Sequence, residues 1–479
     1  MISELDKLGY ILTVGLILLS TWGFPGQIRE VEIALGIGAL LYLLAPFIVS
    51  KRRFRKDFKN AVNFLQKLPK SYWPYLVPLF LMLALIIFSC LNPSFELDRS
   101  AGGPLPGLRE KEHVAWLPSS AVPEATKRKT PILFYLLIIQ GPAVFLIFRR
   151  RSLTRVLLWT ILINTIILSI AGIFVKGSGS SKILWSFSTI EPRYFFSTFN
   201  YKNHWGAYCI LNLGIIGALL NYYVRYPRHQ NRRSRYSPIP ILILAGVIIG
   251  LTVPISGSRS CSLLYGGVFS VLLTHYFSHK LLSRLPYWSR MLTATGSALT
   301  LSTLLLWTSL QFDKENKEEI FRVTKRQVVN FLEKGKLETR FYISRDTWKM
   351  FQEKPIWGWG LGTYEFIINI PEKYLGDEHE GNRYENAHND WFQYMAETGS
   401  TGFLLLAFII LTPLFMSLRR GQFNPISNWL WGTIILMLLY SFVEFPCRTP
   451  AVALLITIMI SIGTKYSLLE KKRRPSIEI

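Results

Sequence analysis

Cysteine is scarce in this 479-residue sequence, which has only four: Cys90, Cys209, Cys261 and Cys447. All four lie in or next to apolar segments and none belongs to a CxxC pair, so neither a disulfide framework nor a zinc site is predicted. Acidic residues are also few, with 30 Asp and Glu against 54 Lys and Arg. Such an excess of positive charge is typical of proteins that bind either nucleic acid or a membrane surface.

Long apolar runs with few charges recur along the chain, and each is about long enough to cross a bilayer as a helix. A soluble protein of this length would show amphipathic periodicity instead. The sequence therefore predicts an all-α polytopic membrane protein with about twelve transmembrane helices. The predicted segments are 8–24, 31–50, 73–92, 130–148, 154–175, 204–224, 237–255, 259–277, 291–311, 399–418, 428–443 and 450–467.

Positive charge is concentrated in alternate loops between these segments. The loops expected in the cytoplasm are 1–7, 51–72, 149–155, 225–236, 278–290, 419–427 and 465–479. They hold 28 Lys and Arg but five Asp and Glu, whereas the rest of the chain holds 26 and 25. This asymmetry follows the positive-inside rule and predicts cytoplasmic termini. The basic loops are expected to contact anionic membrane lipids, and no nucleic-acid partner is predicted.

Three loops on the opposite side are long enough to carry a function: 93–129, 176–203 and 312–398. The expected organisation is nine helices over 1–311, the large and mostly helical loop 312–398, and three helices with a basic tail over 399–479.

The large loop has helical patterns at 315–334, 340–352 and 389–397. Between the last two, the glycines of 358–362 predict a tight turn or a close approach of the backbone. The acidic run Asp377-Glu378-His379-Glu380 resembles a site for a divalent metal, but such runs are usually solvated, so no metal or other cofactor is predicted.

Three residues stand out as candidates for chemistry. Arg259 opens a transmembrane helix, where it either snorkels to the interface or binds phosphate through its guanidinium fork. Arg340 opens the second loop helix and, taken alone, would be a surface residue. His388 precedes the third loop helix, where it is either a structural hydrogen-bonding group or a base that takes a proton from a hydroxyl near pH 7.

Five stretches together resemble the signature of the O-antigen ligase and polymerase superfamily. They are Phe199-Asn200-Tyr-Lys-Asn203-His204, Ser256-Gly-Ser-Arg259, Arg340-Phe-Tyr-Ile-Ser-Arg-Asp-Thr-Trp-Lys-Met350, Pro355-Ile-Trp-Gly358-Trp-Gly360-Leu-Gly362, and Ala387-His388-Asn389-Asp390-Trp-Phe-Gln-Tyr-Met-Ala-Glu397-Thr-Gly399. The order of the motifs and the twelve-helix plan also fit, and the resemblance covers about 110–445. Members often carry a second His just before the catalytic one, where this chain has Asn386.

The resemblance implies a GT-C-like membrane glycosyltransferase of the bacterial inner membrane, with its active site facing the periplasm. The implied donor is a glycan on undecaprenyl diphosphate, whose diphosphate would be bound by Arg259 and Arg340. His388 would be the catalytic base. Possible supporting residues are Asn200, Asn203, His204, Arg193, Lys202, Arg345, Asn389, Asp390 and Glu397.

The implied reaction is metal-independent, because arginines stabilise the charge that develops on the leaving diphosphate. It is also inverting, because the acceptor hydroxyl attacks from the face opposite the leaving group. No DxD carboxylate pair occurs, which disfavours a metal-dependent sugar transferase. The leading interpretation is a ligase with a lipid A core or similar acceptor. A polymerase, a protein O-oligosaccharyltransferase and a non-enzymatic glycolipid transporter are the alternatives, and the sequence does not display the acceptor.

Overall fold

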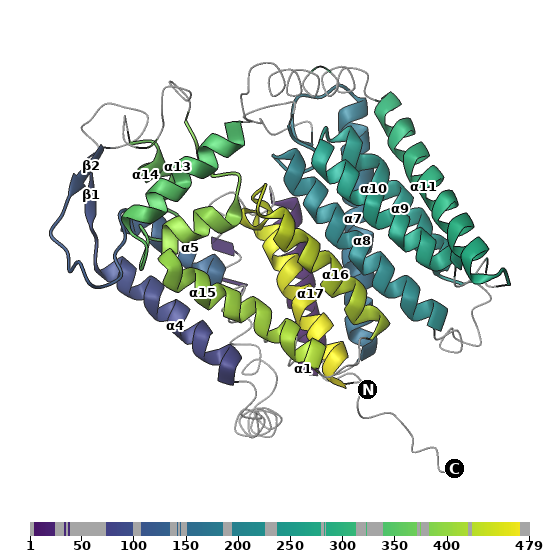
Figure 1. Cartoon of the computed structure of the whole chain (residues 1–479), viewed down its shortest axis with the longest axis horizontal. Helices are drawn as coiled ribbons and strands as arrows, with labels where there is room; N and C mark the ends of the chain where they lie inside the picture. Colours follow the sequence, from purple (N-terminus) through teal and green to yellow (C-terminus); the bar gives the residue numbers. More distant parts are fainter. Residues whose placement is uncertain are drawn as a thin grey trace, which may run out of the picture.

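The structure is a computed structural model, and it is mostly helical over the residues that it describes (Figure 1). It describes residues 4–23, 33–34, 37–38, 73–98, 107–134, 141, 144, 151–184, 194–225, 237–278, 282, 284–312, 322, 339–370, 374, 383–419 and 424–469. The elements before the large loop are α1 (Glu4–Trp22), α4 (Trp73–Leu91), β1 (Phe95–Asp98), β2 (Gly107–Glu110), α5 (Pro123–Phe134), α7 (Arg151–Gly177), α8 (Lys202–Arg225), α9 (Ile239–Ile255), α10 (Arg259–Tyr276) and α11 (Tyr287–Phe312). The remaining elements are α13 (Thr339–Glu353), α14 (Tyr364–Ile368), α15 (Asp390–Arg419), α16 (Pro425–Tyr440), the 3-10 helix η8 (Pro446–Arg448) and α17 (Pro450–Leu469).

Ten of the twelve predicted apolar segments coincide with helices, namely α1, α4, α7 to α11 and α15 to α17. The other two, 31–50 and 130–148, lie largely outside the described residues. Within the described part of the chain, α7, α8, α15 and α17 are long and apolar enough to cross a membrane, and α1, α4, α9 and α16 contain shorter apolar stretches. The chain is therefore a helical membrane protein, whereas twelve spans and their orientation stay predictions.

Helix α8 lies at the centre of the membrane core because its glycines allow close packing. It packs against α16, α10 and α9, and its side chains are buried along nearly its whole length. A Cβ at Gly206 would overlap Cys261 of α10, and one at Gly214 would overlap Thr433 of α16. Small residues at such contacts let two helix backbones approach closely, which supports helix association in a bilayer.

The loop 93–129 contains a structure that the all-α prediction missed. Strands β1 and β2 pair antiparallel, with Phe95 opposite Glu110. Phe95 also packs on Trp359 of the large loop, with ring centroids 6.2 Å apart. Strands of four residues are too short to show a period-2 pattern, so the sequence carried little signal for this hairpin.

The large loop has the predicted order of helix, glycine turn and helix. Helix α13 confirms the helix expected at 340–352, while the one expected at 315–334 lies outside the described residues. The segment expected at 389–397 is the first part of α15, which is kinked at Gly399 (φ 67°) before it continues as the membrane helix.

The glycine turn is joined to this first part of α15 through backbone hydrogen bonds. Gly358, Gly360 and Gly362 all have positive φ, at 72°, 105° and 76°. The amide of Gly360 donates to the carbonyl of Glu397 at 2.7 Å, and that of Trp359 donates to Ala396 at 3.0 Å. This turn needs glycine for two reasons: its backbone is left-handed, and it lies too close to α15 to leave room for a Cβ atom.

We expect Gly358→Ala to destabilise the protein. The new Cβ would lie 2.5 Å from the backbone of Glu397, which is a steric overlap. The left-handed backbone would cost about 1–2 kcal/mol more, because the residue would no longer be glycine. Gly267→Ala is the matched control, because Gly267 lies in α10 with no atom within 4 Å of the added Cβ. Thermal unfolding in detergent measures both, and an equal midpoint for the two variants would contradict the role of the turn.

Candidate functional site

Helix ends from distant parts of the sequence converge on one place in the structure. The first residues of α8, α13 and α15 contact the segment 441–449, which connects α16 to α17, and the first residues of α10 contact Tyr440 just before it. The four helices themselves are labelled in Figure 1. Each helix N-terminus carries partial positive charge from the aligned peptide dipoles of its helix. The convergence of four of them makes this region suited to an anion.

A buried carboxylate, Glu444, lies at the centre of this convergence. Its side chain is 1% exposed. Its Oε1 lies 2.5 Å from Arg340 Nη1 of α13 and accepts a hydrogen bond from Asn203 Nδ2 of α8 at 2.5 Å. The same Arg340 nitrogen donates to the carbonyl of Val443 at 3.2 Å. Glu444 therefore ties the large loop to the membrane helices and orients the guanidinium of Arg340.

Asn203 connects this carboxylate to the start of α10. Its Oδ1 accepts a hydrogen bond from Ser258 Oγ at 2.5 Å, and its backbone carbonyl accepts one from the Cys261 thiol at 3.6 Å. Arg259 lies between Ser258 and Cys261 in the sequence and is partly buried. The fold thus brings the backbone of Arg259 next to the Asn203–Glu444 pair.

His388 lies on the other side of Glu444, with its Nδ1 3.7 Å from Glu444 Oε2. Its backbone is left-handed, at φ 51°, which costs energy for a residue that is not glycine and often marks a functional position. The ring lies against Phe445, with centroids 4.8 Å apart, and at the edge of Tyr201 at 6.5 Å. Tyr201 has a raised pKa because of its burial and the nearby Glu444, so its phenol stays protonated.

The helix that follows His388 is anchored by its first residues. Asn389 Oδ1 accepts from the amide of Phe392 at 3.0 Å and caps the helix. The amide of Asp390 donates to the carbonyl of Ser441 at 2.9 Å, and its carboxylate accepts from the amide of Cys447 at 2.9 Å. These contacts fix the position of His388 relative to the 441–449 segment.

A second ionic group, Arg448 with Glu397, lies beside the first. Arg448 Nη1 lies 3.2 Å from Glu397 Oε2, and its Nε lies 3.7 Å from Asp390 Oδ1. Although burial alone would lower the pKa of Arg448, the two carboxylates raise it. The other contacts of Glu397 are hydrogen bonds from the amide of Gly362 at 3.0 Å and from Gln393 Nε2 at 3.2 Å.

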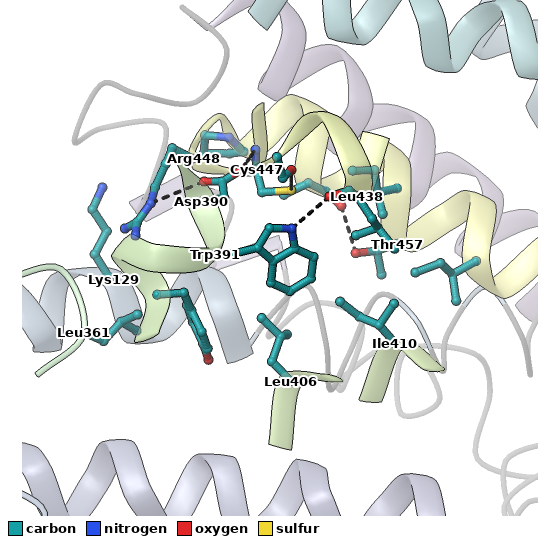
Figure 2. Close-up of a pocket in the computed structure, with 16 residues that line it drawn as sticks. Lys129, Leu361, Asp390, Trp391, Leu406, Ile410, Leu438, Cys447, Arg448 and Thr457 are labelled. Atoms are coloured by element: carbon teal, nitrogen blue, oxygen red, sulfur yellow. Dashed lines mark hydrogen bonds and ion pairs between the residues drawn. The ribbon is translucent and has the colours of Figure 1, made fainter. Parts of the chain in front are cut away.

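Next to this group is a cavity of about 220 Å³ between α15, α16 and α17. Figure 2 shows Arg448 and Asp390 at one end of it, near Lys129, and apolar side chains such as Leu406 and Ile410 along its wall. A cavity that is ionic at one end and apolar along its length can hold part of an amphiphile.

Of the remaining predicted site residues, His204 packs against the cluster, while the contacts described for Lys202 and Arg345 are with residues outside it. His204 is 4% exposed, and its ring packs on Phe445, with centroids 5.0 Å apart. Lys202 places its ammonium 4.6 Å from the ring centroid of Tyr194. Arg345 pairs with Asp346 at 3.0 Å within α13.

Asn200, Arg193 and the acidic run 377–380 were also considered from the sequence, and the structure describes no contact between them and the cluster. Asn200 lies in an exposed turn before α8. Arg193 lies outside the described residues, as does the acidic run 377–380. Across the part of the chain that the structure does describe, no group of three or more His, Cys, Asp or Glu side chains is arranged to hold a metal ion.

Glu444 and Arg448 are not among the site residues predicted from the sequence. A signal for them was present, because an ionisable residue within or beside a membrane segment is costly and usually functional or paired. Their partners, however, lie 51 to 241 positions away along the chain, and no local pattern connects them.

We expect Arg448→Met to destabilise the protein strongly, because it leaves the buried carboxylates of Glu397 and Asp390 without their cation. Removing one partner of a buried ion pair costs about 3–5 kcal/mol. Arg383→Met is the control, since its pair with Glu365 is more exposed and is worth at most about 1 kcal/mol. Thermal unfolding in detergent compares the two, and equal losses would show that burial does not matter here.

Comparison with known families agrees with the motifs. Residues 244–407 match the family model described as O-Antigen ligase. This range contains Arg259, Arg340 and His388, and it confirms the resemblance to the O-antigen ligase superfamily. No curated protein matches the chain.

Proposed function

We propose that this chain, whose residues 244–407 match the O-antigen ligase family, is a glycosyltransferase of the ligase type. It transfers a glycan from undecaprenyl diphosphate to an acceptor hydroxyl, on a lipid A core or a similar glycan, at the periplasmic face of the bacterial inner membrane. The transfer is independent of metal ions and inverts the anomeric centre.

One observation carries this proposal: a single buried carboxylate lies within 2.5 to 3.7 Å of both an arginine and a histidine. Glu444 contacts Arg340 and Asn203 through Oε1 and faces His388 through Oε2. An arginine beside a candidate base is the combination that transfer from a diphosphate requires, because one group stabilises the leaving charge and the other removes a proton.

The charge around the cluster suits a diphosphate leaving group. Arg259 and Arg340 each open a helix, so their guanidinium charges add to the dipoles of α10 and α13. Cleavage of the anomeric C–O bond leaves its electron pair on the phosphate oxygen. Oriented cations stabilise that charge better than water does, because they need not reorganise during the reaction.

His388 is positioned to act on the acceptor. Its residue is partly buried and immediately precedes the capped start of α15. It would accept the hydroxyl proton as the acceptor oxygen attacks the anomeric carbon from the face opposite the leaving group. Phosphate is already a competent leaving group, so the reaction needs no strong general acid.

The lipid part of the donor would lie against the cavity beside Arg448. Its wall is formed by apolar residues of α15, α16 and α17, among them Leu406, Ile410 and Ile456. Two of these helices are apolar enough to cross a membrane, which supports a place for a hydrocarbon chain beside them.

Reconstitution with a lipid-diphosphate glycan should show that His388→Ala, Arg259→Lys and Arg340→Lys lose transfer by roughly 10²- to 10⁴-fold. Lys cannot reproduce the two parallel hydrogen bonds of a guanidinium with phosphate. Arg345→Lys is the matched control and should retain activity, because its partner Asp346 also pairs with Lys349 at 2.9 Å.

The same assay identifies the acceptor and tests the need for metal. Glycan on a lipid A core supports a ligase, whereas lengthened lipid-linked chains would make the protein a polymerase and glycosylated protein an oligosaccharyltransferase. Transfer should persist in EDTA. Full activity of His388→Ala would refute the proposed base, and loss in EDTA that Mg²⁺ restores would refute metal independence.

Filling the cavity should raise the KM for the donor. Ile410→Trp places an indole inside the cavity, whereas Leu411→Trp, at the next position of α15, adds one to an exposed face that does not line it. We expect the first variant to raise the KM for a long-chain donor at least several-fold and the second to leave it unchanged. Equal KM values would place the lipid chain elsewhere.

A further inference from the structure

Two buried polar atoms of the cluster face each other without a hydrogen bond. Glu444 Oε2 and His388 Nδ1 lie 3.7 Å apart. Among the residues that the structure describes, neither atom has a hydrogen-bond partner. Burying such groups unpaired is costly, so a partner is expected at this position in the working protein.

Each of the two side chains is held in place by its other contacts. Glu444 Oε1 is held by Arg340 and Asn203, which fixes the plane of the carboxylate. His388 is held by its left-handed backbone and by the ring of Phe445. An approach of about 1 Å brings the two atoms to the 2.7–2.9 Å expected for a hydrogen bond with a charged partner.

We propose that Glu444 is a positioning residue for His388: its Oε2 accepts the Nδ1–H hydrogen bond and thereby leaves Nε2 with a lone pair for the acceptor hydroxyl. This inference rests on the proposed function for its chemical consequence, but the hydrogen bond itself can be observed without any reaction. A histidine is commonly oriented in this way by a carboxylate on its other ring nitrogen.

The proton balance of the step is simple. As the acceptor O–H breaks, its proton moves to His388 Nε2 and its electron pair forms the bond to the anomeric carbon. The anomeric C–O bond breaks and its electron pair stays on the diphosphate. Glu444 remains ionised and stabilises the imidazolium through Nδ1–H. The proton then leaves Nε2 for the departing diphosphate or for water.

Other titratable groups face the same pair. Arg340 of α13 lies on Glu444, while Tyr201 and His204 approach from the start of α8. Cys261 of α10 and Tyr440 of α16 also lie near the carboxylate. Of these groups, Arg340 carries a fixed positive charge. This charge destabilises a protonated His388, whereas the carboxylate of Glu444 stabilises it.

The tautomer of His388 tests the inference directly. In ¹⁵N-histidine NMR of the full chain in nanodiscs, His388→Gln identifies the resonance among the seven histidines. We expect the wild-type neutral ring to carry its proton on Nδ1. Glu444→Gln should change this, because an amide can donate to Nδ1 and so favour a proton on Nε2. A wild-type proton on Nε2 would overturn the proposal, and this measurement needs no variant at Glu444 to fold.

The pH profile of transfer gives a second readout. Removing the carboxylate charge in Glu444→Gln should move the acid limb of kcat to lower pH and lower the plateau about 10²-fold or more. Arg340→Gln should move the limb in the opposite direction, because it removes a positive charge. A Glu444→Gln profile with an unshifted acid limb would overturn the positioning role.

The outcomes separate this inference from the proposed function. An Nδ1–H tautomer in a protein that transfers no lipid-linked glycan would leave the pair in place and refute the proposed function. Normal transfer with an unchanged tautomer and profile in Glu444→Gln would refute the pair alone.

Discussion

The ion pair and hydrogen bonds of Glu444 are the interactions on which the candidate site depends. A carboxylate that is 1% exposed at the edge of a membrane core is stable only with charged or strongly donating partners. Arg340 supplies the charge and Asn203 a hydrogen bond. Because these partners come from the large loop and from α8, satisfying one buried group also fixes the position of the loop over the membrane helices.

The second ionic group, formed by Arg448 with Glu397 and Asp390, also holds the large loop against the membrane helices. Arg448 joins Glu397 and Asp390 of α15, and Glu397 in turn accepts a hydrogen bond from the glycine turn through Gly362. The loop is thus held by two neighbouring buried networks that share the segment 441–449. His388 lies between them, which explains how a left-handed backbone is maintained at a residue that is not glycine.

The sequence predicted the features that depend on neighbouring residues, such as helices and turns. Hydrophobic run length located ten helices, and the glycines at 358–362 indicated the turn whose positive φ values the structure confirms. The motifs also indicated Asn203, Arg340 and His388, which the structure brings to one carboxylate. Glu444 was not predicted as a site residue because burial and partner choice are tertiary properties. The β1–β2 hairpin was missed because its strands are too short to show a period.

Glu444 and Arg448 come after their side-chain partners in the sequence, and this order has a consequence for biogenesis. Asp390 and Glu397 are synthesised about 50 residues before Arg448, and Asn203 more than 200 before Glu444. Until the segment after α16 has been synthesised, each of these residues lacks the partner that burial requires. Synthesis of the segment between α16 and α17 therefore has to precede formation of the site, which cannot form on a nascent chain that lacks this segment.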